Sequence, residues 1–247
     1  MAGHSKWKQI KRKKAVTDQR RGAAFTQLIK EITIAAKAGG GDPAGNARLR
    51  TAIDAARAAN MPADNIDRAI KKGTGELEGV SYQEVTYEGF GPGGAAIFVE
   101  VTTDNPNRTV AELRNLFTKN GGHLGASNSV AWMFDRRGEI RVDATHHTED
   151  AVMEAALDAG ASDFTRDGDQ YVVATEVHDL HRVQEALRAR QIAWESAEIA
   201  MLPKNTVKVH GGDASRLVRL MESVEEHDDV AKVFSNFDVD EEALAEV

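Results

Sequence analysis

The sequence contains no cysteine, few aromatic residues and no long apolar run. Without cysteine the chain can form no disulfide, no cysteine-ligated zinc or iron–sulfur site and no thiol nucleophile, which fits a reducing compartment. No apolar run approaches the roughly 20 residues that a membrane span needs. The basic N-terminus lacks the apolar stretch of a secretory signal, and we interpret it as part of the mature protein rather than as a transit peptide. We therefore expect a cytoplasmic protein without membrane contact.

Motifs for nucleotide hydrolysis and metal chemistry are also missing. There is no G-x-x-x-x-G-K-[ST] loop and no H-E-x-x-H pair. The glycines of residues 89–94 satisfy G-x-G-x-x-G, but a strand is predicted after them, so we interpret them as a hairpin turn. His146-His147 and the pair His178 and His181 are interpreted as surface or capping histidines. We expect no catalytic residue, no cofactor, no metal site and no obligatory small molecule.

The net charge of −8 hides an uneven distribution of charge along the chain. Residues 1–75 hold 16 Lys or Arg and 6 Asp or Glu, whereas the remainder holds 15 and 33. Such asymmetry favours a nucleic-acid-facing end. Because the acidic remainder repels phosphate, we expect contact with a polyanion only at the basic end.

Residues 1–22, which we call the basic arm, carry most of this positive charge. The arm has no complete apolar face, so little independent folding is expected. Its cations can neutralise phosphates, and its tryptophan can stack on an unpaired base. The expected nucleic-acid contacts are Lys6, Trp7, Lys8, Lys11, Arg12, Lys13, Lys14, Arg20 and Arg21. A second set of cations could extend the nucleic-acid contact over the helices that follow, and a solvated helix face explains them equally well. They are Arg48, Arg57, Arg68, Lys71 and Lys72.

Three helices are predicted after the arm, from apolar residues at helical spacing. The first ends at the glycines of residues 39–41. Asp42-Pro43 is the predicted N-cap of the second helix, which ends near Asn60. Pro62 opens the third, and Gly73 is its predicted stop.

From Ser81 onward the pattern predicts mixed strands and helices. Strands over 85–89, 95–102 and 130–135 and a helix over 107–120 come first, and residues 135–203 then show the βαββαβ order of a ferredoxin-like fold. A final strand, helix and strand bury too little alone, so we expect them to complete the sheet begun at Ser81. The predicted fold class is α+β. The predicted domains are an arm and three-helix domain (1–78), a discontinuous middle α/β domain (79–134 and 204–247) and an inserted ferredoxin-like domain (135–203).

Several long motifs resemble the YebC/PmpR family. They are GHSKW at 3–7, GGGDP at 39–43, NMPADNI at 60–66, YEGFGPGGAAIFVE at 87–100, GGHLGASNSVAWMF at 121–134, and HDDV at 227–230 with NF at 236–237. They cover nearly the whole chain, and the family is similar to the human translational activator of cytochrome c oxidase subunit one. The resemblance implies three domains around a cleft. It implies DNA-binding transcriptional regulation in some members and ribosome-linked help with proline runs in others.

Two residues depart from the family pattern, and each has an expected local solution. Pro106 is expected at a helix start with Asn105 as its cap. Asn128 stands where glycine is usual, and asparagine tolerates a left-handed backbone better than most residues.

The residues leave two functions open for a protein that we expect not to be an enzyme. The first is a DNA-binding transcriptional regulator, and the alternative is a ribosome-associated translation factor that binds ribosomal RNA. DNA regulators normally use a recognition helix and a two-fold dimer, and the sequence predicts neither clearly. The acidic residues between Glu222 and Asp229 are interpreted as a solvated face, with a contact surface for a basic partner as the alternative.

Overall fold

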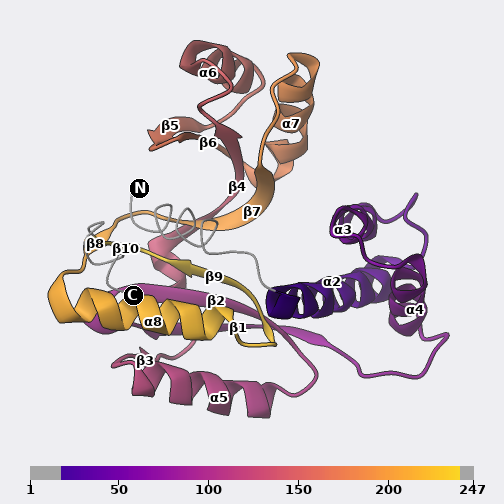
Figure 1. Ribbon diagram of the computed structural model, residues 1–247, viewed down its shortest axis with the longest axis vertical. Helices are drawn as coiled ribbons and strands as arrows, with labels where there is room; N and C mark the ends of the chain where they lie inside the picture. Colours follow the sequence, from indigo (N-terminus) through magenta and orange to yellow (C-terminus); the bar gives the residue numbers. More distant parts are fainter. Residues whose placement is uncertain (1–17, 240–247) are drawn as a thin grey trace.

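The computed structural model describes residues 18–239, with side chains from residue 24 onward. Figure 1 shows a helical part beside a central sheet, further helices along one side of that sheet, and a second sheet with its own helices above it. The fold is α+β, as predicted. None of the described helices is both long and apolar enough to cross a membrane.

The helical part consists of α2 (Asp18–Gly39), α3 (Ala47–Ala58) and α4 (Ala63–Thr74). Their apolar faces meet in one core that includes Ile32, Leu49 and Ile66. Because α2 begins at Asp18, the last residues of the predicted arm belong to a helix. That part of the arm prediction is wrong.

Two predicted helix boundaries are also wrong, because tertiary contacts decide which of two nearby residues caps or ends the helix. Asn46, not Asp42, caps α3: its Oδ1 accepts the backbone N–H of Leu49 at 3.0 Å, and its amide donates to Ala35. Gly75 ends α4 with a left-handed φ of 83°. Gly73 lies inside the helix instead, at its crossing with α2.

The middle sheet has the strand order β3-β1-β2-β9. Its elements are β1 (Gln83–Phe90), the turn η1 (Pro92–Gly94), β2 (Ala96–Thr103), α5 (Pro106–Lys119), β3 (His123–Leu124), α8 (Gly211–Glu225) and β9 (Val230–Ser235). The glycine-rich segment is a hairpin turn, as predicted. Asn105 caps α5 with Pro106 at its start, and Asn128 has a φ of 65°, so both expected local solutions are confirmed.

Strand β2 is buried on both faces, which places the sheet at the centre of the molecule. On one face of the sheet, Ile97 and Val99 pack in a core with apolar residues of α5 and α8. Phe98, on the other face, packs with Phe134 and Ala200 of the second sheet. The second sheet is thus fixed to the first by an apolar contact.

The second sheet has the antiparallel order β5-β6-β4-β7, which is the ferredoxin-like arrangement. Its elements are β4 (Phe134–Asp143), α6 (Glu149–Asp158), β5 (Asp163–Asp167), β6 (Gln170–Thr175), η3 (Val177–Asp179), α7 (Leu180–Ala189) and β7 (Ser196–Pro203). The predicted separate strands over 130–135 and 139–143 are wrong. Residues Ala131–Met133 form the short helix η2, and β4 runs unbroken because β7 pairs with it from Phe134 to Arg141.

The segment after Pro203 only partly follows the prediction. Strand β9 does complete the middle sheet, antiparallel to β2. Strand β8 (Val207–Lys208) instead pairs in parallel with β10 (Phe237–Asp238), as a separate two-stranded sheet. The three-domain division with boundaries at 78/79, 134/135 and 203/204 stays a prediction.

Candidate functional site

A polar cleft of about 670 Å³ opens where α2, α5 and the turn from α8 to β9 meet. Its lining residues are Thr26, Lys30, Tyr82, Asp104, Arg108, Glu112, Asn115, Leu116, Glu226, His227, Asp228 and Asp229. Five of these carry carboxylates and two carry fixed positive charges. The cleft therefore repels phosphate and does not suit a nucleic-acid backbone.

The floor of the cleft is the buried carboxylate of Asp229, whose side chain is only 6% exposed. Its Oδ1 accepts a bond from Lys30 Nζ at 2.8 Å, and its Oδ2 accepts one from Arg108 Nη2 at 2.7 Å. The hydroxyls of Thr103 and Thr109 also donate to Oδ2. Burial alone would raise the pKa of Asp229, but the bonds from Lys30, Arg108 and Thr109 outweigh it and hold the pKa far below its usual range.

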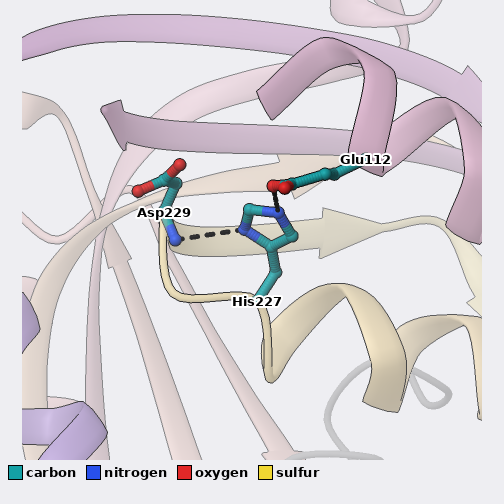
Figure 2. Close-up of side chains that lie close together, drawn as sticks. All are labelled: Glu112, His227 and Asp229. Atoms are coloured by element: carbon teal, nitrogen blue, oxygen red, sulfur yellow. Dashed lines mark hydrogen bonds and ion pairs between the residues drawn. The ribbon is translucent and has the colours of Figure 1, made fainter. Parts of the chain in front are cut away.

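His227 lies between Asp229 and Glu112 and links two elements (Figure 2). Its Nδ1 accepts the backbone N–H of Asp229 at 3.1 Å, so Nε2 carries the hydrogen of the neutral ring. Nε2 lies 2.9 Å from Glu112 Oε2 on α5. The imidazole thus bridges the α8–β9 turn to α5.

Glu112, His227 and Asp229 lie close enough together to be considered as metal ligands. The surroundings do not fit that role. Both oxygens of Asp229 already accept bonds from Lys30 and Arg108. A metal ion would have to displace these cations or share one carboxylate with them, so the cluster is better described as a hydrogen-bond chain.

The side chains of the predicted nucleic-acid contacts are not among those that the structure describes. Lys6, Trp7, Lys8, Lys11, Arg12, Lys13 and Lys14 are outside the described residues. Arg20 and Arg21 lie on α2, but their side chains are outside the described set. Their role in binding stays a prediction.

The second predicted set of cations is mostly engaged in ion pairs. Arg48 is 2.7 Å from Glu31 and 2.6 Å from Glu84, and bonds to these carboxylates raise its pKa above its usual value. Weaker pairs join Arg57 to Asp54 and Lys71 to Asp67, each within one helix. Arg48 is therefore a link between α2, α3 and β1 rather than a free phosphate contact.

Sequence reasoning missed the two residues that organise the cleft. Asp229 was grouped with a solvated acidic face, and Lys30 received no role, yet their side chains form one buried ion pair. Local sequence held no signal for Lys30, since at helical spacing it falls on the side of α2 opposite the apolar residues Leu28 and Ile32. Nothing in the local sequence separates Asp229 from the exposed Asp228 beside it.

Comparison with known proteins gives consistent matches over almost the whole chain. Residues 5–76 match the family model described as "TACO1/YebC protein N-terminal domain", and residues 82–237 match "TACO1/YebC second and third domain". A Gemmatimonas aurantiaca protein named "Probable transcriptional regulatory protein" is 58% identical over 246 residues, covering 100% of both chains. A Chlorobium luteolum protein of the same name is 54% identical over 245 residues, covering 99% of this chain and 98% of its own.

A solved structure extends this similarity to three dimensions. The crystal structure of a conserved hypothetical protein from Aquifex aeolicus matches with a TM-score of 0.83 and 44% identity, covering 90% of this chain and 92% of that one. Sequence and fold therefore point to the same family.

Proposed function

The chain belongs to the TACO1/YebC family, and we propose that it is a cytoplasmic, DNA-binding transcriptional regulator whose basic arm contacts the phosphate backbone. The observation that carries this proposal is the segregation of charge: residues 1–75 hold 16 basic and 6 acidic side chains within a chain of net charge −8. The names of the relatives as probable transcriptional regulatory proteins support it. A nucleic acid would therefore be attracted electrostatically to residues 1–75 and repelled by the remainder of the chain.

The cleft supports this assignment by exclusion. Its acidic lining disfavours phosphate, and its Lys30, Arg108, Glu112 and His227 side chains already hold internal partners. We propose no catalytic role for it. Its ion pairs instead hold the helical part against the middle sheet.

The test is the salt dependence of binding to a labelled DNA duplex, measured by fluorescence anisotropy. Replacing Lys11, Arg12, Lys13 and Lys14 with Ala should flatten the slope of log affinity against log salt by roughly 2–4 units, at about 0.7–0.9 per lost phosphate contact. The matched control replaces four exposed arginines of the second sheet and its helices with Ala, which changes the net charge equally: Arg166, Arg182, Arg188 and Arg190. An unchanged slope in the arm variant would contradict the proposal.

A second candidate function is a ribosome-associated translation factor that uses the same arm on ribosomal RNA and assists synthesis of proline-rich sequences. The engagement of Arg48 favours it, since a groove-reading helix needs several free side chains at one face. Sucrose-gradient co-sedimentation with ribosomes, with and without excess duplex DNA, separates the two functions. Co-migration that survives the DNA makes translation the primary role, whereas free protein or loss to the competitor favours transcription.

A further inference from the structure

One large aromatic side chain stands out on the surface of the described residues. Trp132, in η2, is 64% exposed, while the other exposed large hydrophobic residues lie on separate elements: Leu77, Val80 and Leu157. Its indole Nε1–H donates to the backbone oxygen of Ser129 at 3.1 Å. The indole N–H thus has its hydrogen-bond partner within the protein. The part of the side chain left for a binding partner is its flat, exposed ring.

The ring is held by a rigid support. The buried carboxylate of Glu88 accepts three backbone N–H groups, from Asn128, Val130 and Ala131, each at 2.7 Å. Val130 and Phe134, on either side of η2, are buried in the apolar contact between the two sheets. An aromatic ring placed on such a support loses little conformational freedom when it binds a partner.

The neighbourhood of the ring suits a nucleotide better than a protein partner. Lys204, 45% exposed, donates to the Trp132 backbone carbonyl at 2.9 Å and lies 3.4 Å from Asp135, so an ammonium is held at the backbone of the residue that carries the ring. The exposed residues of 125–128 are small or polar. A stable protein interface needs about 800 Å² on each side, which one isolated ring does not supply, whereas a base needs only a flat face and a nearby cation.

We propose that Trp132 is a stacking platform for an unpaired base of single-stranded nucleic acid, with Lys204 beside the adjacent phosphate. The inference rests on the nucleic-acid function proposed above and adds a second contact, separate in sequence from the basic arm. It assigns this surface to nucleic acid that is not fully paired, because a base inside a duplex presents no free face.

The experiment uses the full chain labelled with 5-fluorotryptophan and ¹⁹F NMR, because the three tryptophans report separately. Trp7 reports on the arm, Trp132 on the proposed platform, and Trp194, which packs beside Arg188, serves as the internal control. Each resonance is assigned with a Trp→Phe variant. The probes are oligo(U), oligo(dT) and an abasic oligonucleotide of the same length.

The expected result is a shift of the Trp132 resonance with oligo(U) or oligo(dT) but not with the abasic chain, since stacking requires a base. Trp132→Ala should weaken oligo(U) binding about 5- to 150-fold, and Trp132→Phe should retain most of the affinity. Leu157→Ala, which removes an exposed apolar side chain elsewhere, should change nothing.

Other outcomes overturn the inference in distinguishable ways. A shift of Trp7 alone, with unchanged affinity of Trp132→Ala, leaves the proposed function standing and removes Trp132 from it. Absence of binding to every oligonucleotide and to duplex DNA would overturn the proposed function, and this inference with it.

Discussion

At the scale of single residues, the Asp229 carboxylate connects three elements. Lys30 reaches it from α2 and Arg108 from α5, and Asp229 itself precedes β9. A buried ion pair is seldom worth more than a well-packed apolar group, but removal of one partner leaves an uncompensated charge. The network therefore specifies one docking geometry more than it adds to stability.

Asp229→Asn should lower the free energy of unfolding by about 3–5 kcal/mol, because Lys30 would remain buried without its counter-charge. Urea unfolding measures this directly. Asp228→Asn is the matched control: it makes the same chemical change one residue earlier on an exposed side chain, and a shift within about 0.5 kcal/mol is expected. Equal midpoints for the two variants would contradict the role given to Asp229.

The acid side of the stability profile should also depend on Asp229. Its pKa is lower in the folded than in the unfolded chain, so its contribution is complete above about pH 4 and is lost as pH falls toward the folded value. The stability difference between wild type and Asp229→Asn should therefore shrink below about pH 4. Urea unfolding repeated across this range measures it, and a difference that stays constant would argue against the ionised pair.

At the scale of elements, close helix crossing decides which glycines are required. A Cβ on Gly73 would lie 2.4 Å from the Thr33 carbonyl oxygen and 2.7 Å from the Ala36 Cβ, so α2 and α4 can approach only where α4 lacks a side chain. By contrast, a Cβ on Gly212, in the first turn of α8, would meet nothing within 4 Å.

Gly73→Ala should destabilise the protein by about 1–3 kcal/mol through overpacking. Gly212→Ala should be neutral or slightly stabilising, since alanine favours the helix. Thermal unfolding of the two variants tests the difference. If Gly73→Ala were as stable as Gly212→Ala, the crossing would have room that the structure does not show.

At the scale of the whole molecule, polar bonds join the helical part to the middle sheet. Gln27 donates to the Asp228 and Val230 carbonyls, and Lys30 donates to the Thr102 and Asp228 carbonyls as well as to Asp229. Arg48 adds a more exposed pair with Glu84. The connecting segment 75–82 includes the exposed Leu77 and Val80. The attachment therefore depends on a few side chains.

Lys30→Met should loosen this attachment while keeping the apolar stem of the side chain. Limited proteolysis should then cut within 75–82 several-fold faster than in wild type, as the helical part separates more often. Arg57→Ala, which removes an exposed cation from the same part, is the control and should leave the rate unchanged. Early cutting inside 95–130 in either variant would contradict the predicted boundaries.

The sequence by itself determined the fold class, most elements and the basic end of the chain. Periodicity of two or 3.6 is a local property, as is the glycine-rich hairpin turn or the proline at the start of α5. The continuity of β4 and the pairing of β8 with β10 were not predictable in this way, since each depends on a partner strand distant in sequence.

The functional residues likewise fall into those that the sequence reveals and those that only the tertiary structure reveals. The arm was found from the sequence because a run of cations needs no partner to be recognised, and its binding role stays a prediction. Only the tertiary structure separated Asp229 from Asp228, Asn46 from Asp42 and Gly75 from Gly73. In each pair both residues are chemically able to fill the role, whether ion-pair partner, helix N-cap or helix end. Contacts with residues distant in sequence decide which of the two does so.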